Sequence, residues 1–175
     1  QLRSLSIFRF GTCGSLQAHI PVDSFVAGSH GLGFDNVMHY YSEQCTKEET
    51  QMIDAFIAHT GLKGNVTPYI FTGSNELLQH FSKGFYQGIT VGCPGFYGPQ
   101  GRVLRLGLAY PGLIEKLTDF RFGNTFISNF EMETSAIYGL GRALRHRCLS
   151  LNVIVANRVL KQFSKDGAAA VENLI

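Results

Sequence analysis

The run from Cys148 to Ala156 constrains the fold of this chain more than any other stretch of the sequence. It is apolar at most positions and rich in β-branched residues, such as Val153, Ile154 and Val155. A strand of this composition is buried on both faces, and such strands are typical of parallel sheets that helices cover on both sides. The run therefore predicts an α/β fold built around a mainly parallel sheet.

The rest of the chain alternates between strand and helix patterns, which supports the same fold class. Strands are predicted at 5–10, 24–27, 66–72, 86–91 and 125–128. Helices are predicted after the capping box of Thr46 and Glu49, after Ser74, from Pro111, after Ser135 and at the end of the chain. Two glycine-rich stretches, 11–16 and 28–33, are predicted to be a tight turn and a loop.

Size and composition exclude several classes of protein. The 175 residues contain no linker or internal repeat, so we expect one domain. Charged residues make up 16% of the chain, against about 25% in a typical domain, which indicates a surface partly covered by another subunit. A net charge of +2 predicts no nucleic-acid partner, and no run is long enough to span a membrane. The four cysteines lie far apart without metal-ligand spacing, so we expect free thiols in the cytoplasm and no metal.

Both ends of the chain fall inside predicted elements. The first strand begins as early as Leu5, and Ile175 still belongs to a helical pattern. We therefore expect residues 1–175 to be a single domain that lacks the N-terminal part of a larger protein.

Polar residues follow four of the predicted strands. They lie at 9–15, 96–102, 131–133 and 157–158. Because the carboxyl ends of parallel strands meet at one edge of a sheet, we expect these residues to share one pocket.

Arg9 is a charged residue within an apolar strand pattern. An arginine fork and a threonine hydroxyl suit an oxyanion, so Arg9 and Thr12 could bind phosphate. A salt bridge from Arg9 to one of the acids would explain the same position. The glycines nearby decide nothing, since Gly11 and Gly14 fit neither the dinucleotide-binding nor the P-loop pattern.

The loop at 96–102 has the groups needed to recognise a planar ring. The amide of Gln100 has a donor and an acceptor, so it can pair with an imide edge. Arg102 beside it can hold a carbonyl oxygen on which charge develops, and Phe96 and Tyr97 offer flat surfaces for stacking. Ordinary turn chemistry explains a loop this rich in glycine and proline equally well.

Two carboxylates, Glu131 and Glu133, stand where a predicted strand gives way to a helix. Ligands of open α/β sheets bind in such a crevice. The start of a helix also favours negative charge because its first amides are unpaired. The residues by themselves leave both interpretations open.

Three motifs resemble the nucleoside phosphorylase family, and most closely its uridine phosphorylases. In chain order they are Phe8-Arg9-Phe10-Gly11-Thr12-Cys13-Gly14, Phe96-Tyr97-Gly98-Pro99-Gln100-Gly101-Arg102 and Asn129-Phe130-Glu131-Met132-Glu133-Thr134. The resemblance extends over nearly the whole chain. It implies a three-layer α/β/α fold with a mixed, partly barrel-like central sheet, and assembly as dimers or trimers of dimers.

The resemblance implies a phosphate site beside a ribose site. Arg9 and Thr12 would bind phosphate. Glu133 would hold the ribose 2′- and 3′-hydroxyls, with Met132 packed on the sugar and Glu131 in a supporting position.

The resemblance also implies a base site. Gln100 and Arg102 would bind uracil, with Phe96 against the ring. Gly14 would lie alongside the base and Cys13 close to it and the sugar, with the 157–158 region at the border of the base pocket. Arg9, Arg102 and Glu133 would then be the catalytic residues.

The activity that the resemblance implies is phosphorolysis of uridine to uracil and ribose 1-phosphate, in nucleoside salvage or catabolism. Inorganic phosphate would be the co-substrate, and no cofactor would be needed. Asn157 stands where the family's purine enzymes have an aspartate, which favours a pyrimidine. A purine phosphorylase or a nucleosidase of the same fold is the first alternative.

One departure from the family pattern opens a further alternative. A glycine-aspartate-proline turn and another phosphate-binding arginine precede these motifs in the family, and neither occurs in this sequence. A protein without them would be a non-catalytic nucleoside-binding domain.

Overall fold

The computed structural model describes residues 3–62, 64 and 66–175. The strands are β1 (Ser6–Ser15), β2 (Phe25–Gly33), β3 (Tyr69–Thr72), β4 (Tyr86–Gly92), β5 (Arg121–Phe122), β6 (Thr125–Glu131), β7 (Arg147–Asn157) and β8 (Gln162–Phe163). The α-helices are α1 (Lys47–Thr60), α2 (Asn75–Phe81), α3 (Leu113–Asp119), α4 (Thr134–Ala143) and α5 (Gly167–Glu172). Two short 3₁₀ helices, η1 (Val37–Tyr40) and η2 (Gly98–Gln100), are also found in these ranges.

Within the described ranges, five strands close into a barrel. β2 pairs with β4, β4 with β6, β6 with β1 and β1 with β7, and β7 returns to β2. The β2–β4, β4–β6 and β1–β7 pairs are parallel, whereas the β1–β6 and β2–β7 pairs are antiparallel. The α/β fold with a mixed, barrel-like sheet is therefore confirmed.

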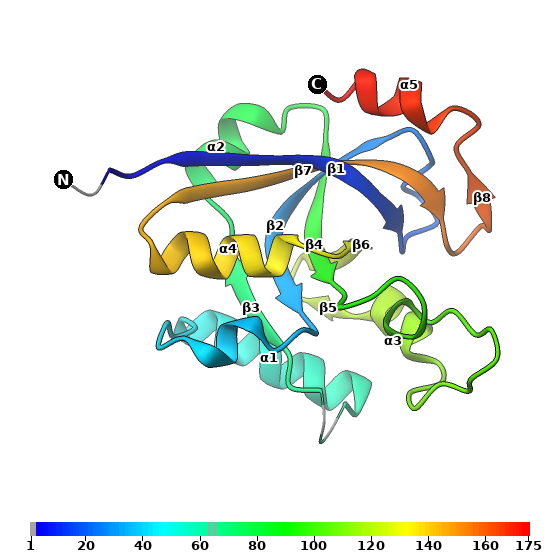
Figure 1. The fold of residues 1–175 in the computed structure, drawn as a ribbon, viewed down its shortest axis with the longest axis horizontal. Helices are drawn as coiled ribbons and strands as arrows, with labels where there is room; N and C mark the ends of the chain where they lie inside the picture. Colours follow the sequence, from blue (N-terminus) through cyan, green and yellow to red (C-terminus); the bar gives the residue numbers. More distant parts are fainter. Residues whose placement is uncertain (1–2, 63, 65) are drawn as a thin grey trace.

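β1 and β7 form the longest pairing of the barrel and run side by side across the molecule (Figure 1). Their register extends from Ser6 opposite Arg147 to Ser15 opposite Asn157. β7 is buried at nearly every position, as its composition predicts. Leu149, Leu151 and Val153 pack against α2 and the C-terminal segment, while Cys148 and Ser150 contact α4. Both faces of β7 are therefore covered, which is why its sequence does not alternate between apolar and polar residues.

The helices pack around the sheet through separate apolar clusters. Phe56 of α1 and Leu117 of α3 pack with Ile89 and Ile127 of the central strands. α2 and α5 cover another part of β7, where Leu77, Ala170 and Leu174 meet Leu149, Leu151 and Val153. α4 packs on β2, β3, β4 and β7.

The two glycine-rich stretches are strands, so both predictions for them are wrong. Residues 11–15 are the second half of β1, and residues 28–33 belong to β2. The glycines serve close approach instead of turning the chain. A Cβ at Gly11 would overlap the guanidinium of Arg9, and one at Gly31 would lie 2.8 Å from the backbone of Ser135 in α4. Only glycine lets the chain pass this close to its neighbours.

Several local signals are confirmed. Thr46 and Glu49 form the predicted capping box at the start of α1, and Gly61 ends that helix with φ of 70°. Ser74 caps α2 by accepting a hydrogen bond from the amide of Leu77. The last helix is shorter than predicted, because α5 ends at Glu172, and Ile175 lies beyond it with 84% of its surface exposed.

Candidate active site

The structure brings all ten predicted site residues to one cavity of about 200 Å³. They are Arg9, Thr12, Cys13, Gly14, Phe96, Gln100, Arg102, Glu131, Met132 and Glu133. They come from β1, the loop after β4, and the junction of β6 with α4. Phe130, Val155 and Ala156 complete the lining.

Arg9 lies within β1 instead of at its end, which corrects the expectation that all of the polar groups follow strands. Its side chain is 15% exposed, passes over Gly11 of the same strand and lines the cavity. Nη2 lies 2.5 Å from Glu133 Oε2 and 3.1 Å from Glu131 Oε2, and Nη1 donates to Asn152 Oδ1. The predicted salt bridge is therefore present, and it lies in the same cavity as Thr12, the other residue predicted to bind phosphate.

The two carboxylates at the end of β6 differ in their surroundings. Glu131 is buried, and its oxygens accept hydrogen bonds from the amides of Glu133 at 2.9 Å and Thr134 at 3.0 Å. It caps the start of α4 in this way, as the interpretation of a helix-start acid expects. Burial raises the pKa of Glu131, and the nearby Arg9 opposes that shift.

Glu133 is the more accessible acid. Its side chain is 54% exposed, and within the described residues it makes no capping hydrogen bond although it occupies the N-cap position of α4. Arg9 is its ion-pair partner. Met132, between the two acids, is 43% exposed and also faces the cavity. An exposed carboxylate beside an apolar surface can accept hydrogen bonds from neighbouring hydroxyls of one ligand.

The loop after β4 forms a compact unit around Arg102. Arg102 Nη1 donates to Phe96 O at 2.5 Å and to Gln100 Oε1 at 2.6 Å. Its Cζ lies 3.7 Å from the centre of the Phe96 ring. Gln100 is only 4% exposed. Burial lowers the pKa of Arg102, and the positive charge of Arg158 lowers it further. The two arginines thus place positive charge close together, which an electron-rich ring would help to balance.

Cys13 and Gly14 form the floor of the cavity. The thiol of Cys13 is buried and donates to Val153 O at 3.6 Å. Burial raises the pKa of Cys13, so it remains a protonated thiol and is no candidate for a nucleophile. Gly14 lies at a register shift of the β1–β7 pair, where a Cβ would come within 3.4 Å of the Phe130 ring.

The 157–158 region divides into two residues with different roles. Asn157 is buried, with Nδ2 donating to Gln17 O and Ile20 O and Oδ1 accepting from the amides of Val159 and Leu160. Its amide is fully used by the backbone and does not line the cavity, so the argument that Asn157 selects a pyrimidine has no support in this geometry.

Arg158 does not line the cavity either, but it packs against Gly14 and Phe130, which do. Its Cζ lies 5.4 Å from the centre of the Phe130 ring, and its Cγ lies 3.6 Å from where a Cβ of Gly14 would be. Within the described part of the chain, its buried Nη1 has no hydrogen-bond partner. Burial lowers the pKa of Arg158. An unpaired buried donor of this kind is rare and is the type of group that a ligand oxygen satisfies.

Sequence reasoning missed Asn152, Phe130, Val155 and Ala156. Phe130 lies inside the motif that singled out its neighbours, so its place in the site could have been predicted. The other three belong to the buried run of β7. Val155 and Ala156 line the cavity, and Asn152 holds Arg9, which lines it. Nothing in an apolar strand pattern distinguishes such residues from residues that face the core.

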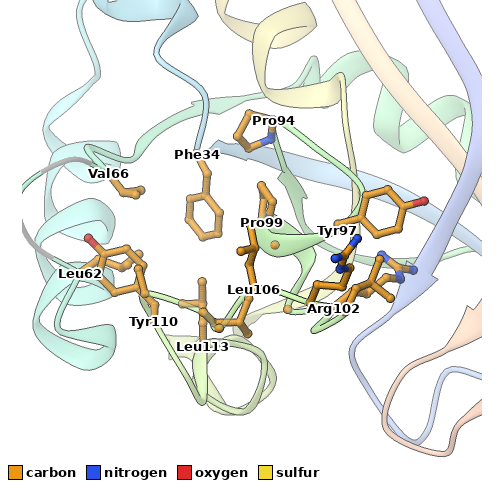
Figure 2. Close-up of a pocket in the computed structure, with 17 residues that line it drawn as sticks. Phe34, Leu62, Val66, Pro94, Tyr97, Pro99, Arg102, Leu106, Tyr110 and Leu113 are labelled. Carbon is orange, nitrogen blue, oxygen red and sulfur yellow. The ribbon is translucent and has the colours of Figure 1, made fainter.

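A larger cavity of about 910 Å³ lies next to this site and shares Arg102 with it. Figure 2 shows its mainly apolar lining, which includes Phe34, Leu62, Tyr110 and Leu113. The segment after Arg102 forms one wall, and Leu106 in that segment is 83% exposed.

Three findings concern only the described residues. They contain no group of three or more histidine, cysteine, aspartate or glutamate side chains placed to hold a metal ion. None of their helices has the length and apolar character needed to cross a membrane. Each of the four cysteines, all in the described part of the chain, is a free thiol.

Solved structures with a fold similar to this one include nucleoside and uridine phosphorylases. A nucleoside phosphorylase from Trypanosoma brucei, described as showing uridine phosphorylase activity, superposes with a TM-score of 0.85 at 28% identity. The match covers 96% of this chain and 60% of that protein. Isoform 2 of uridine phosphorylase from Schistosoma mansoni gives a TM-score of 0.66 at 18% identity, and the match covers 98% of this chain and 56% of that protein. One uridine phosphorylase of Phytophthora capsici gives a TM-score of 0.59 at 20% identity, and the match covers 98% of this chain and 61% of that protein.

The chain thus spans about 60% of the length of the first of these structures. No curated protein sequence matches the chain significantly. The family model of the phosphorylase superfamily matches residues 1–175. This chain therefore belongs to the phosphorylase superfamily.

Proposed function

We propose that the protein is a pentosyltransferase that cleaves uridine with inorganic phosphate, giving uracil and ribose 1-phosphate. The observation that carries the proposal is the single cavity in which Arg9, Glu133, Gln100 and Arg102 lie together. It offers a cation for phosphate, a carboxylate for sugar hydroxyls and an amide–guanidinium pair for a base. The structural similarity to a nucleoside phosphorylase with uridine phosphorylase activity supports the same assignment.

Phosphate would occupy the Arg9 side of the cavity. The guanidinium of Arg9 and the hydroxyl of Thr12 would donate to its oxygens. Glu133 would accept from the ribose hydroxyls, and Met132 would pack against the sugar. Because Arg9 contacts Glu133 directly, the ribose and the phosphate would lie side by side. That is the arrangement needed for a phosphate oxygen to attack C1′ from the face opposite the base, with inversion.

The base side would stabilise the leaving group. Breaking the glycosidic bond leaves positive charge on the ribose and negative charge on uracil. The nearby phosphate dianion would stabilise the first, and Arg102 and Gln100 would donate to the oxygens that carry the second. Donors that bind more tightly as charge develops lower the barrier, so no covalent nucleophile is needed.

Arg158 extends the base site in this proposal. Its buried and unpaired Nη1 is available for a base carbonyl, directly or through one water. Two arginines suit a pyrimidine with two carbonyl oxygens better than adenine, which has none. This supports uridine over adenosine without the argument from Asn157.

The proposal includes a homo-oligomer, either a dimer or a trimer of dimers. Val103, Leu104 and Leu106 are all more than half exposed in one segment beside the site. Contiguous exposed apolar residues mark association surfaces. The free thiols of all four cysteines, which lie in the described residues, fit a cytoplasmic location.

A substrate panel tests the activity. Purified protein is incubated with uridine, deoxyuridine, thymidine, inosine and adenosine, each with and without phosphate, and free base is measured by chromatography. The proposal expects release of uracil only with phosphate, and faster release from uridine than from either purine nucleoside. Phosphate-independent release would make the protein a nucleosidase. Binding of uridine without any turnover would make it a nucleoside-binding domain.

A further inference from the structure

Asn152 holds the guanidinium of Arg9 from inside the barrel. It is fully buried on β7, and its Oδ1 accepts a hydrogen bond from Arg9 Nη1. Arginine has only donors, so the oxygen of the amide has to face it. The other end of the amide, Nδ2, donates to Ser150 Oγ at 3.0 Å.

Ser150 connects this contact to the start of α4. Its Oγ also accepts from Thr134 Oγ1 at 2.8 Å. Its amide donates to the hydroxyl of Tyr138 at 2.8 Å, and that hydroxyl donates to Gly28 O at 2.6 Å. Each member of this chain is buried. A buried network whose members are all paired is rigid, so Asn152 has one orientation.

The register of the barrel makes room for the contact. In the parallel β1–β7 pair, Arg9 lies opposite Ser150 and Gly11 lies opposite Asn152. The Arg9 side chain folds over Gly11 to reach Asn152, and a Cβ at Gly11 would overlap its guanidinium. Gly11 and Asn152 thus form a cradle of matching shape for Arg9.

The charges around Arg9 explain why a neutral group at this position matters. Arg9 already lies within 3.1 Å of two carboxylates, Glu131 and Glu133. A third acid in the cradle would hold Arg9 equally well but would add negative charge where a phosphate dianion has to bind. An amide provides the hydrogen bond without that repulsion.

We propose that Asn152 is the positioning residue of the phosphate site, because its neutral amide fixes Arg9 while leaving the arginine's charge available to phosphate. This inference rests on the function proposed above. It assigns to a residue of the buried β7 run a role in phosphate affinity, although Asn152 does not line the cavity itself.

Two substitutions separate positioning from a purely structural role. Asn152→Asp keeps the shape and the contact with Arg9 but adds charge, so we expect phosphate affinity to fall by roughly 100-fold. Asn152→Ala removes the contact, and we expect a fall of roughly tenfold, the size of one lost hydrogen bond to a charged group. The affinity for uridine should change less than about threefold in both. Asn75→Asp, on the exposed surface of α2, is the matched control for the added charge.

The experiment measures binding of inorganic phosphate and of uridine by calorimetry, the KM values of both in turnover, and the thermal unfolding midpoint of each variant. A selective loss of phosphate affinity that is larger in Asn152→Asp than in Asn152→Ala supports the inference. Equal losses for phosphate and uridine, or unchanged phosphate affinity in Asn152→Asp, overturn it. If Asn152→Asp does not fold, Ser150→Ala replaces it, because this variant removes the hydroxyl that orients the Asn152 amide. An unchanged phosphate affinity in Ser150→Ala then overturns the inference.

The same data separate this inference from the proposed function. A wild-type protein that binds phosphate but does not cleave uridine refutes the function, while the order of phosphate affinities among the variants still tests Asn152. A wild-type protein that cleaves uridine with phosphate, and keeps its phosphate KM in Asn152→Asp, retains the function and refutes the inference.

Discussion

Glu133 and Arg9 form the contact on which the proposed chemistry turns. Arg9 Nη2 lies 2.5 Å from Glu133 Oε2, so each side chain holds the other beside the positions proposed for the sugar and the phosphate. An ion pair exposed on one side is worth little to stability, because water competes with it.

Replacing Glu133 should remove discrimination between ribose and deoxyribose. Glu133→Ala loses the acceptor for the 2′-hydroxyl, so we expect kcat/KM for uridine to fall by roughly 100-fold and that for deoxyuridine by less, which brings the two values together. Steady-state kinetics with both nucleosides measure this. Glu115→Ala, an exposed acid of α3, is the matched control. An unchanged ratio of the two nucleosides in Glu133→Ala would show that Glu133 does not bind the sugar.

Gln100→Ala should impair uridine turnover more than phosphate affinity. The side chain is buried against Arg102 in the loop after β4, on the base side of the cavity. Its loss leaves part of the base edge unpaired, and we expect roughly a 100-fold lower kcat/KM for uridine with a nearly unchanged KM for phosphate. Gln51→Ala on the exposed side of α1 is the control. Equal losses for the two substrates would argue against a base-binding role.

Three secondary-structure elements are joined by one buried acid. Glu49 of α1 is 1% exposed in its side chain and pairs with Arg142 of α4 at 2.5 Å and 2.8 Å. It also accepts from the amide and hydroxyl of Thr72 at the end of β3. The Arg142 side chain also lies over the Phe71 ring.

This pair predicts a loss of stability in acid. Burial opposes ionisation of Glu49, but the hydrogen bonds from Arg142 and Thr72 outweigh it and lower its pKa from 4.5 to about 2. An acid whose pKa is lower in the folded state stabilises the fold above its unfolded pKa. The contribution, on the order of 3 kcal/mol, is then lost as the pH falls from about 4.5 through about 2.

Urea unfolding at several pH values checks this expectation. Glu49→Gln cannot ionise, so its free energy of unfolding should be lower at pH 7 and should depend less on pH between 4.5 and 2 than that of the wild type. Parallel pH profiles for the two proteins would contradict the assignment.

Elements marked by local chemistry could be predicted from the sequence. The capping box of α1, the Ser74 cap and the buried strand β7 depend on side chains close in sequence, and all are confirmed. The junction of β6 and α4 was predictable for the same reason, because Glu131 satisfies amides only two and three residues away.

Elements decided by distant contacts could not be predicted. Gly11 and Gly31 read as turn residues, yet both lie in strands because a guanidinium and a helix backbone pass close to them. Asn157 read as a base selector, yet its amide is used by four backbone groups from two loops. Nothing in the sequence singled out Asn152. Its role becomes visible only when closure of the barrel places it under Arg9.

Closure of the barrel is what assembles the site. β1 pairs with β7 on one side and, at its last residues, with β6 on the other. Arg9, the acids of β6 and the residues of β7 therefore face the same interior. The loop after β4 adds the proposed base side, because β4 is the parallel neighbour of β6 and ends beside it. Residues far apart in the chain therefore meet without any long insertion, and all three parts of the proposed site lie around one barrel.

The most direct test of this account is the identity of the products formed from uridine and phosphate. Phosphorus NMR follows the reaction while uracil is measured by absorbance in the same sample. We expect equal amounts of uracil and α-ribose 1-phosphate, and no uracil when phosphate is left out. Uracil that appears with free ribose, or that appears at the same rate without phosphate, would contradict the assignment of a phosphorolytic site at Arg9, Glu133 and Gln100.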